Sequence, residues 1–191
     1  MTASSSPLPI GLLGAGRIGK VHAAAIASTV GARLTAVADA LAEPAQAIAD
    51  AYGPDVRSID EIMAAVDIDA VSITTPTDMH ADLIEQAARA GKSIFCEKPI
   101  DLDVDRVRGC LAVVAETGVS LMVGFNRRFD PNFRAVRDRI DAGEIGDVEM
   151  VNIISRDPGP PPLEYMARSG GLFRDMTIHD FDMARFLLGD E

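Results

Sequence analysis

A narrow stripe of ionisable side chains lies near the end of the chain, in a segment otherwise rich in Met, Ile, Phe and Leu. Asp175, His179 and Asp182 are spaced i, i+4 and i+7, so a helix would hold them within a stripe roughly 60° wide. A solvated face would be broader and would contain Lys and Glu, so we expect the stripe to face a cleft or a buried partner. An acid beside a histidine can orient the imidazole for proton transfer. A buried Asp–His hydrogen bond that only fastens the helix explains the same pattern, and the stripe alone leaves both interpretations open.

A lysine stands at the end of a strand-like run. "SIFCE" (93–97) predicts a strand, so Glu97 and Lys98 follow at its carboxyl end, the edge where open α/β sheets bind ligands. The strand predicted over 70–75 ends at the same edge, in Thr74, Thr75 and Pro76. A lysine beside a cationic ligand can have a lowered pKa and relay a proton. Spacing alone favours a solvated surface lysine.

A G-x-G-x-x-G pattern follows the first strand-like run and opens a helical one. Gly14 permits a tight turn, Gly16 lets a pyrophosphate approach the backbone, and Gly19 lets helix and strand pack closely. Asp39 ends the next strand, 20 positions after Gly19, where a carboxylate can accept hydrogen bonds from both ribose hydroxyls of NAD. It would repel the 2′-phosphate of NADP. The alternative is that the glycines serve only a turn and that Asp39 serves only as a cap.

Strands and helices must hold these residues in place, and the sequence pattern of the first 125 residues predicts a regular alternation of the two. Strands over 8–14, 32–39, 70–75, 93–97 and 120–125 alternate with helices over 17–29, 40–53, 77–91 and 103–117. Ser58 and Glu61 form a capping-box pattern, and Thr77 is expected to cap the helix that Gly91 ends. Such alternation predicts a doubly wound parallel sheet with right-handed crossovers.

The later part predicts a different arrangement. Asp130 and Pro131 form an N-cap and first-turn pair, residues 146–157 read as one long strand, and 176–188 as a helix. We therefore predict an α/β chain with a Rossmann-type domain over 1–125. Residues 126–191 would form a second part, which the family resemblance given below implies to be the beginning of a truncated α/β open-sheet domain for substrate binding and oligomerisation.

Composition excludes several classes of function. The formal net charge is −11 and the sequence pI about 4.6, which argues against nucleic acid or an anionic membrane as a partner. The sequence has neither a secretory signal pattern nor an apolar run of the ~20 residues that a membrane helix needs, so a cytoplasmic location is expected. Cys96 and Cys110 fit no disulfide or metal framework, and the three histidines lack metal-ligand spacing, so no metal site is expected.

Four stretches together carry a family resemblance. "GAGRIGKVHA", "TPTDMH", "EKP" and "DMTIHDFDMARFLLG" resemble the Gfo/Idh/MocA oxidoreductases, which pair a Rossmann domain with an open-sheet α/β domain. "GFNRRFDPNF", "ISRDP" and "GGLFRDMTIHDFDMARFL" are most similar to the bacterial inositol 2-dehydrogenases of that family. The resemblance covers about residues 10–189.

The resemblance implies roles for particular positions. Lys98 matches a catalytic lysine often followed by a cis proline, here Pro99, while Asp175 and His179 match a catalytic dyad and Asp182 a recurrent acid. The implied substrate-binding residues are Lys98, Asn126, Arg127, Asp157, Asp175 and His179. The candidate cofactor-binding residues are Gly14, Gly16, Arg17, Ile18, Gly19, Asp39, Thr74, Thr75, Pro76, His80, Glu97, Lys98 and Arg127.

The implied activity is NAD-dependent oxidation of a secondary ring hydroxyl of a cyclic polyol, taking myo-inositol to 2-keto-myo-inositol in inositol catabolism. A related sugar or another inositol isomer is a second hypothesis, and an NAD-binding fragment without catalysis is a third. Members of the family exceed 300 residues, so we expect this chain to be truncated and its full-length form to be a homo-oligomer, a dimer or a tetramer.

Overall fold

The computed structural model describes residues 6–156, 159–160, 166 and 169–189. The chain separates into two units, Met1–Gly124 and Phe125–Glu191. Each unit has its own set of contacts and is described by itself below.

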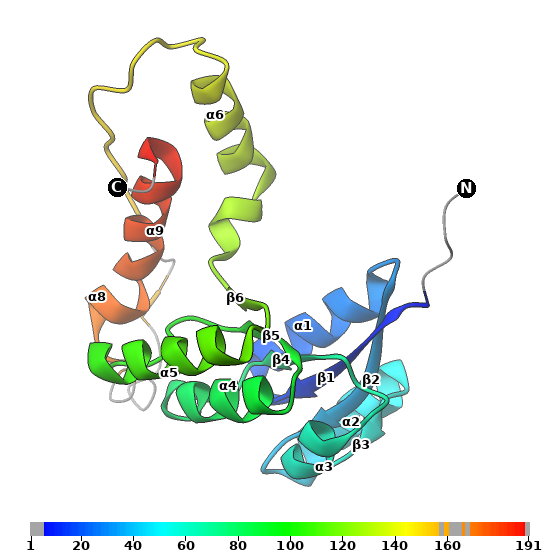
Figure 1. Ribbon diagram of the computed structural model, residues 1–191. Coiled ribbons are helices and arrows are strands. Elements are labelled where there is room, and N and C mark those ends of the chain that lie inside the picture. The colour runs from blue at the N-terminus through cyan, green and yellow to red at the C-terminus, as the bar shows by residue number, and fades with distance from the viewer. Residues whose placement is uncertain (1–5, 157–158, 161–165, 167–168, 190–191) are drawn as a thin grey trace. The chain divides into compact units, whose positions relative to one another are not determined.

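Six strands form one sheet in the first unit (Figure 1). They are β1 (Leu8–Leu13), β2 (Ala32–Ala38), β3 (Asp55–Val56), β4 (Ala70–Ile73), β5 (Ser93–Cys96) and β6 (Leu121–Val123). The order is β3-β2-β1-β4-β5-β6, and every neighbouring pair is parallel. The predicted doubly wound parallel sheet is therefore confirmed, with its reversal of strand order between β1 and β4. The two-residue strand β3 extends the sheet beyond the predicted strands.

Helices cover this sheet through two separate cores. They are α1 (Arg17–Ser28), α2 (Ala42–Tyr52), α3 (Ile59–Ala64), α4 (His80–Arg89) and α5 (Val104–Thr117), with a 3-10 helix, η1, at Thr77–Met79. Apolar side chains of α1 and α2 pack with Leu12, Leu34 and Val37, whereas those of α3, α4 and α5 pack with Leu13, Val71 and Ile73. Consecutive residues of a strand, such as Leu12 and Leu13, thus pack into different cores, because side chains alternate between the two faces of a pleated strand.

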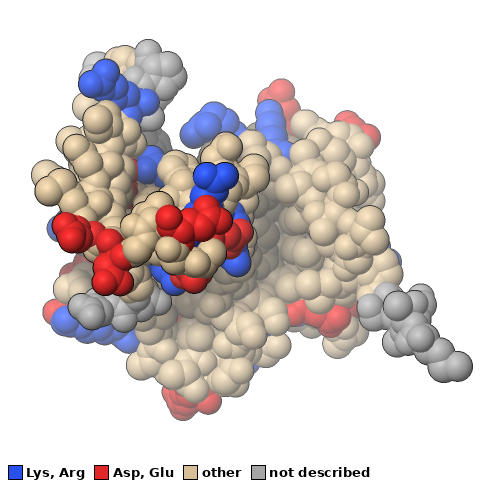
Figure 2. Space-filling view, turned by 90° about the horizontal axis from the view of Figure 1, so that it is seen from above, with Lys and Arg blue, Asp and Glu red and all other residues tan. Residues whose placement is uncertain are grey.

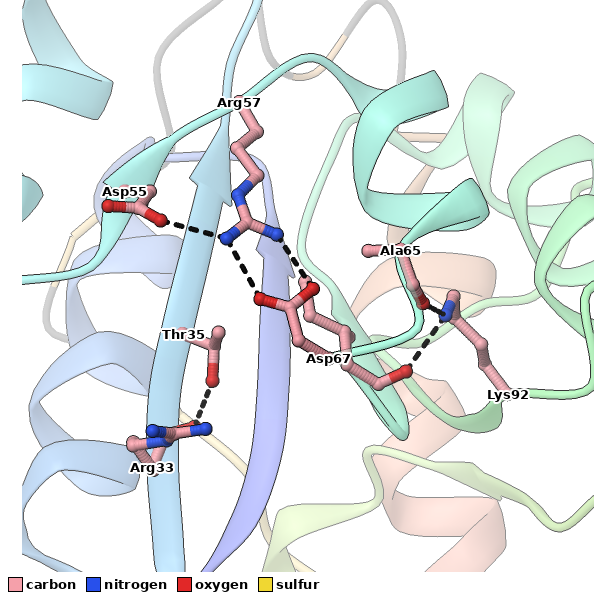
Figure 3. A network of polar contacts seen from close by, with 8 residues as sticks. Arg33, Thr35, Asp55, Arg57, Ala65, Asp67 and Lys92 are labelled. Atoms are coloured by element: carbon pink, nitrogen blue, oxygen red, sulfur yellow. Dashed lines mark hydrogen bonds and ion pairs between the residues drawn. The ribbon is translucent and has the colours of Figure 1, made fainter.

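Polar contacts join the residues around β3 to the segment that follows α3, and Lys92 binds the same segment (Figure 3). Arg57 donates to Asp55 at 2.8 Å and to both carboxylate oxygens of Asp67 at 2.9 Å. Lys92, which is only 4% exposed, donates from Nζ to the carbonyls of Ala65 and Ile68, both at 2.8 Å. Ala65 is the C-cap of α3, so the ammonium group neutralises the partial negative charge at that helix end.

Two of the predicted helix caps are present in the structure and one is not. The capping box at Ser58 and Glu61 is confirmed, and Asp130 caps a helix that begins at Pro131. The N-cap expected at Thr77 is wrong. The amide of Met79 donates to the carbonyl of Pro76 at 3.0 Å, which closes a 3-10 turn around Thr77 before α4 begins.

The second unit is helical over the residues that carry regular structure. Its elements are η2 (Asn126–Phe129), α6 (Pro131–Asp141), α8 (Leu172–Asp175) and α9 (Thr177–Leu188), and α9 packs against α6 and η2. Ion pairs at i, i+4 join Arg134 to Asp138 and Arg137 to Asp141 along α6. On the face seen in Figure 2, basic and acidic side chains are interspersed.

The strand predicted over 146–157 is wrong. Residues 148–156 have no strand assignment, and Asp157 lies outside the described residues. A strand is stable only when its backbone groups pair with a neighbour, and within the described part of the second unit no strand is available to pair with it.

Among the described helices, none is both long enough and apolar enough to cross a bilayer.

Candidate active site

The glycine loop between β1 and α1 is shaped by close backbone packing. Gly14 has φ +98°, and a Cβ there would lie 2.8 Å from backbone atoms of Thr74 and Thr75. A Cβ at Gly19 would lie 2.1 Å from the carbonyl oxygen of Gly14. Both positions therefore require glycine, and the predicted reasons, a tight turn and close helix–strand packing, match this geometry.

The middle glycine has a different environment. No atom lies within 4 Å of a Cβ built on Gly16. Gly16 is the N-cap of α1, which has no acidic residue in its first turn and no side-chain cap. Arg17 and Ile18 are the first two helical residues, so their amides and the positive end of the helix dipole are directed at this opening. The loop thus has the shape and the electrostatics that suit a pyrophosphate.

Asp39, at the end of β2, is held against the same loop. Its Oδ2 accepts a hydrogen bond from the amide of Ala15 at 2.6 Å, and its Oδ1 accepts one from the amide of Leu41 at 2.9 Å. An ionised carboxylate has about four acceptor sites, so both oxygens keep capacity for a ribose hydroxyl. The side chain is half-buried, which leaves it accessible. These residues fit the adenosine half of a dinucleotide.

The end of β4 lies beside the glycine loop. The hydroxyl of Thr74 is within 3.0 Å of the Leu13 carbonyl and 2.8 Å of the Gly14 carbonyl, and the residue is buried. Thr74 therefore joins β4 to the loop through its side chain. The hydroxyl of Thr75 is buried and has no hydrogen-bond partner among the described residues, while Pro76 is exposed. Of the three, Thr75 retains unused hydrogen-bonding capacity.

Glu97 and Lys98 follow β5, as predicted. Nε2 of His22, from α1, lies 2.7 Å from Oε1 of Glu97. Burial by itself would raise the pKa of Glu97, but the hydrogen bond and the charge of His22 outweigh it, with help from Lys98, and hold that pKa below 4.5. Lys98 is half-buried, and the peptide bond between Lys98 and Pro99 is cis.

His80 lies inside the first unit. It is 1% exposed, with Nδ1 2.7 Å from the Pro99 carbonyl and Nε2 2.8 Å from the Thr75 carbonyl. Both ring nitrogens are therefore engaged with the backbone. The role of His80 in binding the cofactor stays a prediction, and the burial of its ring does not favour that role.

Arg127 is the central candidate of the second unit. It pairs with Asp180 of α9 and donates to the hydroxyl of Ser155 at 3.0 Å. Asn126, immediately before it in η2, is exposed. Asp180 was not among the predicted site residues, because acids are common on helix surfaces and only the fold shows its arginine partner.

Asp182 has a structural partner. Arg128 donates to its carboxylate from Nε at 2.8 Å and from Nη2 at 2.7 Å, and Asp182 is only 8% exposed. The Arg128 guanidinium also lies 5.5 Å from the ring centroid of Phe186. One member of the Asp–His–Asp stripe therefore fastens α9 to η2. The sequence does not indicate which acid pairs with Arg127 and which with Arg128.

Asp175 and His179 lie on consecutive helices. Asp175 ends α8, Met176 forms the junction, and His179 lies in the first turn of α9. Both side chains are half-buried, and the His179 amide donates to the Met176 carbonyl at 3.1 Å. The predicted helix over 176–188 is confirmed as α9, with Asp175 on the short helix that precedes it. Among the described residues, no group of three or more His, Cys, Asp or Glu side chains could hold a metal ion.

The chain is similar in sequence and in structure to known inositol dehydrogenases. Over 181 residues the chain is 71% identical to inositol 2-dehydrogenase of Rhizobium meliloti (strain 1021), covering 95% of this chain and 55% of that protein. A crystal structure of a myo-inositol dehydrogenase from Corynebacterium glutamicum ATCC 13032 matches with a TM-score of 0.90 at 50% identity, over 95% and 55% of the two chains. A scyllo-inositol dehydrogenase from Lactobacillus casei, solved with bound NAD(H) and scyllo-inositol, matches with a TM-score of 0.82 at 33% identity, over 96% and 57%. The chain thus spans a little over half the length of these proteins.

Family models match both units. Residues 8–125 match the model of an oxidoreductase family with an NAD-binding Rossmann fold, and residues 133–191 match the Gfo/Idh/MocA C-terminal domain. The order of the glycine loop, the TPTDMH and EKP stretches and the closing helix agrees with these matches. The chain belongs to the Gfo/Idh/MocA oxidoreductase family.

Proposed function

We propose that this protein binds NAD on the glycine loop and oxidises a secondary ring hydroxyl of myo-inositol to the 2-ketone. The observation that carries the proposal is the contrast within the loop: Gly14 and Gly19 are closed by backbone, whereas the Cβ position of Gly16 is open. That opening faces the start of α1 beside Asp39, where a dinucleotide pyrophosphate and ribose would fit. The inositol dehydrogenases it resembles support the substrate class.

The cofactor would be held by the loop amides, by Asp39 and by the strand ends at Thr75 and Pro76. Bound NAD supplies an acceptor for the hydride that leaves the substrate carbon. Asp39 would hydrogen-bond the ribose hydroxyls and disfavour a 2′-phosphate, because two negative groups would then be close together. NAD is therefore the preferred cofactor over NADP in this proposal.

The chain's own side chains would handle the proton. His179 would accept the proton of the reacting hydroxyl, since histidine as a residue type titrates near neutral pH. Asp175 would orient the imidazole and stabilise its charged form. Lys98 would donate a hydrogen bond to the same oxygen as negative charge develops there. Asn126, Arg127 and Asp157 would orient the polyol, with Asp180 holding Arg127 in place.

Two glycine substitutions test the cofactor site. Gly16→Ala places a methyl group in the open position, so it should leave stability within about 1 kcal/mol while weakening NAD binding at least tenfold. Gly109→Ala, in α5, is the matched control, because its Cβ position is also open and lies in no candidate site. Calorimetric titration with NAD and thermal unfolding provide the two measurements. Unchanged NAD affinity in Gly16→Ala would remove the loop from the cofactor site.

A polyol panel tests the reaction. NADH absorbance should appear with NAD and myo-inositol, and scyllo-inositol is the next substrate to compare, because the Lactobacillus casei relative was solved with it. Activity only with glucose or xylose would refute the inositol assignment in favour of a related sugar dehydrogenase. NAD binding without turnover would identify the 191-residue chain as a binding fragment. The expected homo-oligomer and cytoplasmic location stay predictions, which light scattering and cell fractionation would test.

A further inference from the structure

Lys98 stands between two residues that are each held by a different histidine. The side chain of Glu97, before it, lies 2.7 Å from Nε2 of His22, and the carbonyl of Pro99, after it, lies 2.7 Å from Nδ1 of His80. The two histidines come from α1 and α4, helices that begin at the glycine loop and after the end of β4. The chain around the lysine is thus tied on both sides to elements that form the candidate cofactor site.

The contact between His22 and Glu97 is a partly buried hydrogen bond. The side chains of His22 and Glu97 are 21% and 22% exposed, and the His22 ring packs on Phe95 at a centroid distance of 5.0 Å. A Cβ on Gly124 would lie 3.3 Å from the Glu97 carboxylate, so the backbone just after β6 also packs against this side chain. Glu97 therefore has little freedom to leave its position, and solvent screening of the pair is limited.

The tie to His80 involves both ring nitrogens. Nδ1 faces the Pro99 carbonyl and Nε2 faces the Thr75 carbonyl at 2.8 Å. Carbonyl oxygens only accept hydrogen bonds, so an N–H of the ring donates to one of them while the other ring nitrogen lies against the second. One ring then joins the loop that follows β4 to the loop that follows β5. With the ring 1% exposed, water does not provide a substitute partner.

We propose that His22 and His80 are positioning residues that fix Lys98 at the carboxyl edge of the sheet. The proposal rests on the catalytic role given to Lys98 in the proposed function. Neither histidine needs to touch cofactor or substrate: each acts through a neighbour of the lysine. Occupation of the glycine loop would then be coupled to the position of Lys98 through α1, and occupation of the Thr75 loop through α4.

The lysine content makes a direct measurement possible. Lys20, Lys92 and Lys98 are the only lysines in the chain. Reductive methylation with ¹³C-formaldehyde would label the accessible lysines, Lys20 and Lys98, and the terminal amine, while Lys92 is buried; Lys→Arg variants would assign the NMR signals. The signal of Lys98 reports its environment without added NAD, so the result is independent of whether the chain catalyses a reaction.

Paired substitutions separate hydrogen bonding from simple packing. His22→Phe and His80→Phe keep an aromatic ring and lose the donors, whereas His22→Gln and His80→Gln keep a donor and lose the ring. We expect the Phe variants to shift the Lys98 signal and to weaken NAD binding about tenfold, and the Gln variants to stay nearer wild type. Cys110→Ala, a buried change in α5, is the control for general loss of stability and should leave the Lys98 signal in place.

The opposite order, with Gln worse than Phe at both positions, would show that the rings only fill space and would overturn the proposal. An unchanged Lys98 signal in all four variants would overturn it equally. If a Phe variant does not fold, the ring N–H signal of His80 in the wild type provides the second test: an N–H protected from exchange with solvent supports the contact with the backbone carbonyls, and a rapidly exchanging N–H refutes it. Wild-type protein that does not bind NAD would contradict the proposed function while leaving the test of the two ties intact.

Discussion

Lys92 offers a sharp test of the packing in the first unit. Replacing it with Met keeps most of the apolar stem but removes the ammonium group that donates to the carbonyls of Ala65 and Ile68 (Figure 3). Both carbonyls would lose their charged donor at a site where the lysine is 4% exposed. Water has little access there to replace it.

The magnitude follows from two opposing effects. Hydrogen bonds from a charged donor contribute about 1.5–3 kcal/mol each, so two give about 3–6 kcal/mol. Burial of the ammonium group opposes this: it lowers the pKa of Lys92 below 10.5, against the charges of Asp69 and Asp67, which raise it. With that cost removed in the variant, the expected net loss is about 2–4 kcal/mol of unfolding free energy.

Urea unfolding of the whole chain at pH 7 measures this loss, with Lys20→Met as the control because Lys20 is exposed on α1. The control should change stability by less than about 0.5 kcal/mol. The pH dependence provides a second check. Because the folded-state pKa is lowered, the unfolded chain binds more protons between that pKa and 10.5, so wild-type stability gains a component that rises with pH in this window. Lys92→Met should lack this component. Equal midpoints for Lys92→Met and wild type would refute the assigned role.

Four further outcomes are expected. Gly19→Ala should cost at least about 2 kcal/mol, measured by urea unfolding, because its Cβ would meet the backbone of Gly14; a stability equal to wild type would contradict the packing. Asp39→Ala should lower the ratio of NAD to NADP affinity in calorimetry, and an unchanged ratio would refute its role. His179→Ala should abolish NADH formation with myo-inositol while leaving NAD affinity within about twofold, whereas lost NAD binding would make the residue structural. Arg106 on α5 donates a hydrogen bond to Glu85 and lowers the pKa of that carboxyl below 4.5. The stability that this ionised carboxylate contributes is complete above pH 4.5 and is lost as pH falls through the folded-state pKa. Glu85→Gln should therefore show a smaller loss of stability on acidification, measured as urea midpoints.

Local patterns were enough to predict the frame of the first unit. The glycine spacing, the strand before it and Asp39 at the next strand end all describe interactions close together in sequence or imposed by a parallel sheet. The strand predicted over 146–157 failed for the converse reason, because an apolar run forms a strand only where a partner offers its backbone. Propensity alone did not contain that information.

The closing helix shows the same division. Periodicity placed Asp175, His179 and Asp182 on one helix, but the helix is interrupted at Met176, so Asp175 lies on α8. Asp182 proved to be the partner of Arg128, 54 positions earlier. Asp180, which the stripe excluded, holds Arg127. Which acid pairs with which arginine depends on how α9 packs against η2, and many sequences with the same spacing would pack otherwise.

The sequence by itself determined the main strands and helices of the first unit, the glycine loop and the types of residue that could handle a hydride and a proton. Only the tertiary structure decided that Arg127 pairs with Asp180 and Arg128 with Asp182, and that His22 and His80 hold the residues on either side of Lys98. The physical reason is range: periodicity and turn chemistry act over a few residues, whereas these contacts join positions from 19 to 75 apart. Such contacts form only when folding brings the carboxyl ends of parallel strands to one edge.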